Sequence, residues 1–220
     1  DRLSDGVKFM FKSYPETFRV DVYPSHRTHS APQWVYDNTF KNATRGKMDG
    51  LIPQNIYGGI PFPIPQSGAE VMWNHQLLWR GTSYHRDSSS YLITANGKRV
   101  LMTKNVVKSQ FPYYFEDGKI EDFRGNFLYE MSVNSGPPIR TGEGILAQGN
   151  LDPDKYNTYV YLTGQRRVRK LPEGCCDTPT PFSSGQVTFD EIDTFAGGAR
   201  SMERFDWKIL GKKELYLPYN

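Results

Sequence analysis

Two adjacent cysteines, Cys175 and Cys176, stand in the proline-rich stretch PEGCCDTPTP and are the only cysteines among 220 residues. A cysteine nucleophile needs a base within hydrogen-bond reach, and no neighbour in the sequence supplies one. Two thiols with no second pair are also too few for a cysteine zinc site. Their chemistry therefore depends on whether the compartment is reducing or oxidising.

The histidines are the other residues with catalytic or metal-binding chemistry. His26 and His29 are three positions apart in YPSHRTHSAPQW, and His75 lies in EVMWNHQLLWRG. Together they could present imidazoles to a metal, although no H-E-x-x-H pattern accompanies them. Polar loop histidines with local hydrogen bonds are the favoured interpretation, so we expect no cofactor and no metal. His26, His29 and His75 form the alternative metal or catalytic set.

Other motifs that carry chemistry are missing from the sequence. It contains no G-x-S-x-G nucleophile elbow and no Walker pattern, and RDSSSY at residues 86–91 is typical of a polar turn. The basic run GQRRVRKLP stands in a chain with a net charge of only +3. That balance favours a solvated face over a phosphate track, so we expect no nucleic-acid partner.

Short segments rich in β-branched and aromatic residues dominate the chain. The 20 glycines, 15 prolines and an aromatic fraction of 14% favour strands joined by turns. Asn96-Gly97 and Asp117-Gly118 suit tight hairpin turns, which predicts an antiparallel meander. The expected strands cover residues 17–23, 34–39, 70–80, 91–94, 99–103, 110–115, 127–134, 139–148, 158–163, 166–171 and 207–217.

Helical patterns are confined to two segments. Apolar residues recur at helical intervals over residues 2–13, and Thr188 and Glu191 have capping-box spacing at the start of residues 186–195. No apolar run approaches the ~18 residues of a membrane span. We therefore expect a mainly β protein with a few helices, of the α+β class, folded as a single domain over residues 1–220.

The interval of residues 47–66 is rich in glycine and proline and differs from the strands, as does the stretch GGIPFPIPQSG (residues 58–68) that ends it. Ile60, Phe62 and Ile64 alternate with prolines, which fix φ and remove backbone donors. This pattern predicts a stiff, extended strap whose apolar side chains rest either on the core or in a ligand groove.

Aromatic and apolar residues also recur at alternating positions elsewhere. Trp73, Leu77 and Trp79 would share one face of a strand, and so would Tyr159 and Tyr161. Such residues pack in an ordinary core or line a cavity, and both interpretations stay open.

Several long segments together resemble a family of bacterial secreted proteins of unknown function. The family is usually grouped with outer-membrane lipoprotein-sorting proteins, and it is distantly similar to the lipoprotein carriers LolA and LolB. The resemblance covers essentially the whole chain and identifies it as the N-terminal and middle part of a longer LolA/LolB-like protein. The segments are RVDVYPSHRTHSAPQWVYDNTFKNAT, YGGIPFPIPQSGAEVMWNH, NSGPPIRTGE, YVYLTGQRRVRKLPEGCCDTPTP and RFDWKILGKKELYLPYN.

The resemblance implies a curved antiparallel sheet that forms a half-open, LolA/LolB-like barrel over helices and encloses an apolar cavity. It further implies a periplasmic carrier or chaperone for a lipid or other hydrophobic molecule. The partner would be a resistance-nodulation-division-type transporter or an outer-membrane component. The residues expected to contact the ligand are Ile60, Phe62, Ile64, Trp73, Leu77, Trp79, Tyr159 and Tyr161.

Two other functions remain open at this stage. One is an enzyme that acts on a hydrophobic substrate through the loop histidines. The other is a non-catalytic adaptor that docks onto a transporter through GGIPFPIPQSG.

The periplasmic location implied by the resemblance gives the two cysteines a further option. Adjacent cysteines can bond only to each other or to another chain, and the flanking Pro172 and Gly174 suit the unusual turn that such a bond requires. We expect a vicinal disulfide between Cys175 and Cys176 directly after the basic strand. Two free buried thiols are the alternative.

Overall fold

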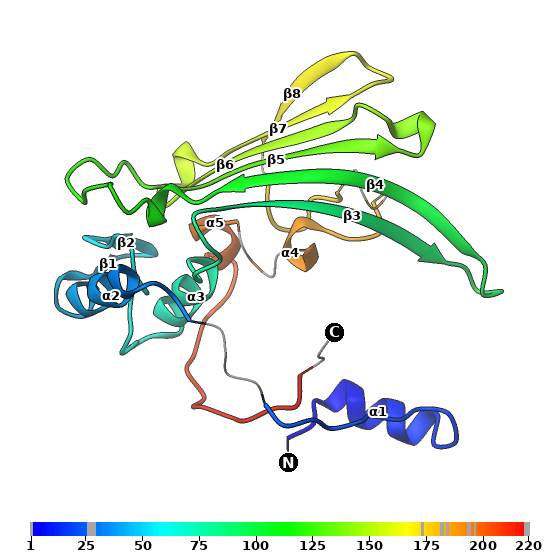
Figure 1. The fold of residues 1–220 in the computed structure, drawn as a ribbon, viewed down its shortest axis with the longest axis horizontal. Helices are drawn as coiled ribbons and strands as arrows, with labels where there is room; N and C mark the ends of the chain where they lie inside the picture. The colour runs from blue at the N-terminus through cyan, green and yellow to red at the C-terminus, as the bar shows by residue number, and fades with distance from the viewer. Residues whose placement is uncertain are drawn as a thin grey trace. The chain divides into compact units, whose positions relative to one another are not determined.

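The computed structural model divides the chain into two compact units (Figure 1). The smaller consists of residues 1–30 and 209–220, and the larger of residues 31–208. The structure describes residues 2–25, 30–172, 174–180, 183, 185–192, 195 and 197–217.

The smaller unit contains helix α1 (Asp5–Ser13), which confirms the helix predicted over residues 2–13. The Val7 N–H donates to the hydroxyl of the N-cap residue Ser4 at 3.3 Å. Residues 17–23 and 207–217 were expected to be strands, but neither segment forms one. β propensity alone was insufficient there, because a strand also needs a partner for its backbone groups.

A six-stranded antiparallel sheet is the framework of the larger unit, within the described residues. Each strand pairs with the next one in the chain, which confirms the meander, and Gly97 in the first hairpin turn has a φ of 79°. The first and last of these strands, β3 and β8, do not pair with each other, so the described sheet is open. The strands are β3 (Ser83–Ile93), β4 (Arg99–Gln110), β5 (Asn126–Gly136), β6 (Gly144–Asn150), β7 (Asn157–Leu162) and β8 (Arg167–Leu171).

The sheet arches over the helices of the larger unit, which lie on one of its faces (Figure 1). The arrangement confirms a mainly β, α+β fold built on antiparallel sheets. These helices are α2 (Gln33–Arg45), α3 (Gly68–Gln76), α4 (Phe189–Ile192) and α5 (Ala199–Met202). A small hairpin and short 3-10 helices complete the unit: β1 (Lys47–Asp49), β2 (Ile52–Gln54), η1 (Pro112–Tyr114), η2 (Pro138–Arg140) and η3 (Pro153–Lys155).

Three further predicted strands are wrong. Residues 34–39 lie in α2, residues 70–80 lie mostly in α3, and most of residues 110–115 lie in and around η1. In α3 the buried residues Trp73 and Leu77 are four positions apart, which is a helical repeat.

The start of α3 was visible in the sequence as a capping box. The Glu70 N–H donates to the hydroxyl of the N-cap residue Ser67, and the Glu70 carboxylate accepts the N–H of the preceding residue, Gln66. Ser67 and Glu70 are three positions apart, so this signal could have corrected the strand prediction.

The GGIPFPIPQSG strap remains outside the strands, as predicted. Asn74 of α3 binds both backbone groups of Phe62 in the strap. Its side chain accepts the Phe62 N–H at 2.9 Å and donates to the Phe62 carbonyl at 2.6 Å. The Phe62 side chain is buried in the core, whereas Ile64 is 76% exposed. The strap therefore contributes to the core through one of its three apolar side chains, with Ile60 half-buried.

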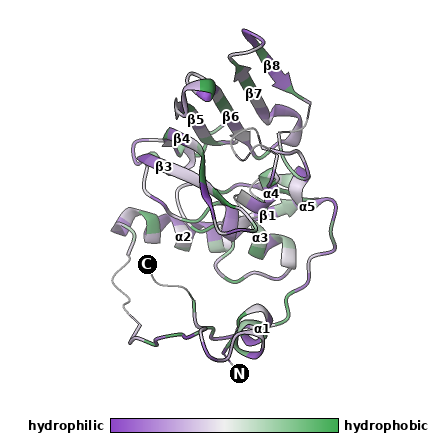
Figure 2. Cartoon of the chain, turned by 90° about the vertical axis from the view of Figure 1, so that its right-hand side faces the viewer, coloured by the Kyte–Doolittle hydropathy of each residue, from purple (hydrophilic) through white to green (hydrophobic). Residues whose placement is uncertain are grey.

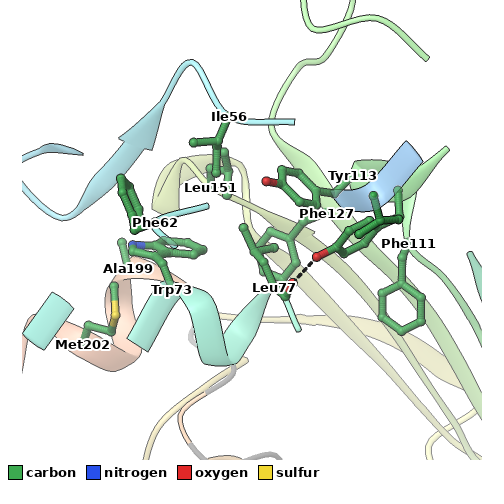
Figure 3. Packing of buried hydrophobic residues seen from close by; sticks show 12 residues of the cluster. Ile56, Phe62, Trp73, Leu77, Phe111, Tyr113, Phe127, Leu151, Ala199 and Met202 are labelled. Carbon is green, nitrogen blue, oxygen red and sulfur yellow. Dashed lines mark hydrogen bonds between the residues drawn. The ribbon is translucent and has the colours of Figure 1, made fainter. Parts of the chain in front are cut away.

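The core of the larger unit is centred on Trp73 (Figure 3). The indole is fully buried, and its N–H donates to the Leu51 carbonyl at 2.8 Å. Its ring meets Phe127 of β5 edge to face at 6.0 Å between centroids. Ala199 and Met202 of α5 belong to the same cluster. Trp73 thus joins α3, the sheet and α5.

Replacing Trp73 by alanine is expected to lower the free energy of unfolding by about 3–5 kcal/mol, because it leaves a cavity and an unpaired Leu51 carbonyl. The matched control is Ile64→Ala in the exposed part of the strap, which should change stability by less than about 0.5 kcal/mol. Denaturant unfolding followed by circular dichroism measures both. Equal midpoints for the two variants would contradict this account of the core.

Candidate functional site

A cavity of about 270 Å³ lies between the sheet and the described residues of the segment 174–197, namely 174–180, 183, 185–192, 195 and 197. Strands β3 to β7 form its floor, and the segment with α4 forms its roof. We call the sheet face that carries this cavity the inner face, and the opposite one the outer face. Because successive strand residues alternate between faces, only every second residue of each strand reaches the cavity.

The strand register decides which residues meet on the inner face. Val107, Ser132 and Ile145 are paired neighbours on β4, β5 and β6. In the adjacent row Glu130, Ala147 and Thr158 are paired across β5, β6 and β7. All six line the cavity. Figure 2 shows hydrophilic and hydrophobic residues interspersed along the strands of the sheet.

Three of the polar residues form a hydrogen-bonded chain across the floor. The Ser88 hydroxyl donates to Asn105 Oδ1 at 2.6 Å, and Asn105 Nδ2 donates to Ser132 Oγ at 2.8 Å. Asn105 and Ser132 are buried. Burying an amide is costly unless its hydrogen bonds are formed. These hydrogen bonds therefore stabilise the polar side chains in the cavity floor.

Glu130 is a carboxyl residue of the floor whose hydrogen-bond partners come from β3 and β4. Its Oε2 accepts the Tyr84 hydroxyl at 3.1 Å and the Ser109 hydroxyl at 2.8 Å. Burial raises the pKa of Tyr84, since desolvation disfavours the phenolate. Tyr84 therefore remains a hydrogen-bond donor to Glu130 at neutral pH.

The roof contains the vicinal disulfide that the sequence predicted, between Cys175 and Cys176. Both residues are buried, and Cys175 lines the cavity. The Cys176 N–H donates to Asp190 Oδ1 at 3.2 Å, which ties the disulfide to α4. Cys176 has a φ of 66°, in the left-handed region that residues other than glycine seldom adopt. The disulfide is therefore part of the cavity wall.

Two glycines allow the roof to approach its surroundings closely. A Cβ added at Gly174 would lie 1.9 Å from Thr158 Oγ1 on the floor. At Gly197 it would lie 2.3 Å from Ser201 Oγ and 2.5 Å from the Cβ of Cys175. Only a residue without a Cβ fits at these two contacts.

The residues that the sequence suggested as ligand contacts lie outside the inner-face cavity. Phe62, Trp73 and Leu77 are in the hydrophobic core, and Trp79 packs against it. Among the described residues that line the inner-face cavity, none belongs to the predicted set of Ile60, Phe62, Ile64, Trp73, Leu77, Trp79, Tyr159 and Tyr161.

Tyr159 and Tyr161 point to the outer face. They line an open hollow of about 530 Å³ together with Met131, Leu146 and Val168. The alternating tyrosines do share a face, as predicted, but this face is opposite to the one that carries the roofed cavity.

The alternative metal set is only partly within the described residues. His26 and His29 lie outside them, and His75 lies in the last turn of α3. Among the residues that the structure describes, no three His, Cys, Asp or Glu side chains are grouped so that they could hold a metal ion.

The cavity residues were missed because the sequence marks them weakly. RDSSSY was interpreted as a polar turn, but it lies within β3. Ser88 and Ser90 alternate there as strand residues on one face do. This alternation of small polar residues was the available signal.

No helix in the described part of the chain is both long enough and apolar enough to cross a membrane.

Comparison with known proteins gives a family and one curated relative. The family described as "Protein of unknown function (DUF1329)" matches residues 1–220. The uncharacterized protein PA3922 of Pseudomonas aeruginosa is 34% identical over 232 residues, which cover 100% of this chain and 48% of that protein. The chain thus spans about half the length of this curated relative. No solved structure matches the chain.

Gly197→Ala is expected to lower the free energy of unfolding by about 1–3 kcal/mol, because the new methyl group overlaps Ser201 and the disulfide. The control Gly164→Ala meets no atom within 4 Å and should change stability by less than about 0.5 kcal/mol. Denaturant unfolding without reductant measures both variants. A Gly197→Ala protein as stable as the control would show that the roof does not pack as described.

Proposed function

This chain belongs to the DUF1329 family of proteins of unknown function, and from that premise we propose that it is a carrier or chaperone for a lipid or other hydrophobic molecule. The inner-face cavity binds the molecule without catalysing a reaction on it. The observation that carries the proposal is the roofed cavity itself, which lies beside the core without being filled by it.

The lining of the cavity supports an apolar ligand. Val107, Leu128 and Ile145 contribute aliphatic side chains from the floor, and Val187 and Phe189 contribute from the roof. Ligand sites are mostly apolar with a few placed polar groups, and they usually measure about 300–1,000 Å³. At about 270 Å³ the cavity suits a small molecule or one segment of a longer acyl chain.

The disulfide supports a periplasmic location for this carrier. Disulfides persist in oxidising compartments, and the bond between Cys175 and Cys176 is part of the cavity wall. The open sheet over helices is compatible with the half-open, LolA/LolB-like barrel that the sequence resemblance implied. Delivery to a resistance-nodulation-division-type transporter or an outer-membrane component belongs to the same proposal.

The test uses two neighbouring residues on β6 that point to opposite faces. Ala147 lines the inner-face cavity, whereas Leu146 lines the outer hollow. Ala147→Phe should fill the cavity and weaken the binding of the fluorescent apolar probe N-phenyl-1-naphthylamine by about tenfold or more. The matched control Leu146→Phe should bind the probe as the unsubstituted protein does.

Two results would contradict the proposal. One is the absence of both saturable probe binding and an apolar compound that copurifies with the protein and is detected by mass spectrometry. The other is loss of probe binding in Leu146→Phe with full binding in Ala147→Phe, which would move the site to the outer face. Circular dichroism of each variant shows that the fold is retained.

A further inference from the structure

The outer face of the sheet carries exposed apolar side chains at its centre, although the solvated face of an antiparallel sheet is usually polar. The strand register places Met131, Leu146 and Tyr159 side by side on β5, β6 and β7. Met131 is 44% exposed and Leu146 is 39% exposed. Val168 of β8, which pairs with Tyr161, is 68% exposed. These five residues line the outer hollow together, and we call them the outer patch.

A glycine contributes to the hollow in the outer patch. Gly144 on β6 lies between Val133 on β5 and Tyr161 on β7 in the strand register. Because Gly144 has no side chain, this row of the outer face is interrupted next to the row of Met131 and Leu146. The hollow of about 530 Å³ is open to the outside. Flexible acyl chains can fill such an irregular surface without a matching shape.

Lysines border the outer patch at both ends of its central row. Lys108 of β4 pairs with Met131, and Lys170 of β8 pairs with Tyr159. Both lysines are exposed, and no ion pair with a described residue is recorded for either. Their ammonium groups are therefore available to an anionic partner.

No carboxylate of these strands lies on the outer face to neutralise the lysines. Within β4 to β8, whose residues are all described, Glu130 is the only carboxyl residue, and it lines the inner-face cavity. On the adjoining β3, the Asp87 carboxylate lies 4.0 Å from His85 Nε2. In the turn between β5 and β6, the Glu143 carboxylate accepts a hydrogen bond from Arg140. The outer face of β4 to β8 is therefore cationic.

An apolar centre bordered by basic residues is typical of proteins that bind to membrane surfaces. Tyrosine is enriched at bilayer interfaces, and a lysine stem can contact apolar chains while its ammonium group stays among the head groups. A specific protein interface contains many hydrogen bonds, yet the tyrosine hydroxyls are the only strong hydrogen-bonding groups in the side chains of the outer patch. A second copy of the chain would bring lysines toward lysines, because a two-fold contact joins the same face of both copies.

We propose that the outer face of β4 to β8 docks onto the surface of a lipid bilayer that carries anionic head groups. The outer patch contacts the apolar part of the bilayer interface, and Lys108 and Lys170 contact the head groups. This surface lies on the opposite side of the sheet from the roofed cavity, so the proposal does not depend on the carrier function.

The test uses the full chain and two kinds of vesicle. One kind contains equal amounts of phosphatidylglycerol and phosphatidylcholine, and the other contains phosphatidylcholine alone. Flotation of the protein with the vesicles gives its partition coefficient. The partition coefficient should be at least about tenfold higher for the anionic vesicles, and high salt should reduce this difference because it screens exposed charges.

Neighbouring residues that point to opposite faces provide matched variants. Lys170→Gln removes a charge from the outer face and should lower the partition coefficient about fivefold. Arg169→Gln removes the same charge from the other face of β8 and should lower it by less than about twofold. Leu146→Gln removes an apolar contact at constant charge and should lower it by about fivefold or more. Ala147→Phe on the inner face should leave it unchanged.

Each alternative occupant of the outer face gives a different result. Flotation with neither kind of vesicle overturns the proposal and leaves the outer patch as a surface for a protein. Dimerisation of the chain that Leu146→Gln abolishes, without vesicle binding, assigns the outer patch to a second copy. Equal binding to both vesicles, or equal losses in Lys170→Gln and Arg169→Gln, also overturns the proposal. Far-ultraviolet circular dichroism checks that each variant is folded.

Discussion

The indole of Trp73 joins parts of the larger unit that are distant in the sequence. Its N–H donates to the Leu51 carbonyl beside β2, its ring meets Phe127 on β5, and α5 packs into the same cluster. This core covers only part of the inner face. Leu128 packs against the core and also lines the cavity, so the cavity begins where the core ends. The Trp73 cluster therefore borders the cavity through Leu128.

The roof lies over part of the inner face and leaves a cavity beneath it. Its close approach depends on backbone without side chains, since Gly174 lies against Thr158 and Gly197 against Cys175. The disulfide and the hydrogen bond from Cys176 to Asp190 fix the turn that directly follows Gly174. Ser201 donates to the same carboxylate oxygen, which links the turn to α5. Asp190 thus connects the disulfide turn of the roof to α5.

The inner face combines properties that an ordinary core avoids. A core excludes polar groups because each one has to be hydrogen-bonded, yet this floor contains the bonded chain from Ser88 to Ser132 and the bonded carboxylate of Glu130. Aliphatic residues stand between these groups. Such a surface is suited to hold a molecule that is itself partly polar, and it gives a family of unknown function a specific chemistry to test.

The sequence by itself determined the elements whose signals are local. Strand alternation and the Asn96-Gly97 turn predicted the meander. The adjacent cysteines predicted the disulfide only together with the oxidising compartment that the family resemblance implied. The segments of α2 and α3 were assigned to strands because of their aromatic and β-branched residues, although the Ser67 and Glu70 spacing was a local signal for the start of α3. Which face of β7 is enclosed was decided by tertiary structure alone. Side chains alternate between the two faces of a strand, so the sequence shows that Tyr159 and Tyr161 share one face of β7 and that Thr158 is on the other. Only the packing of the described roof residues against one face decides which of these residues line the cavity.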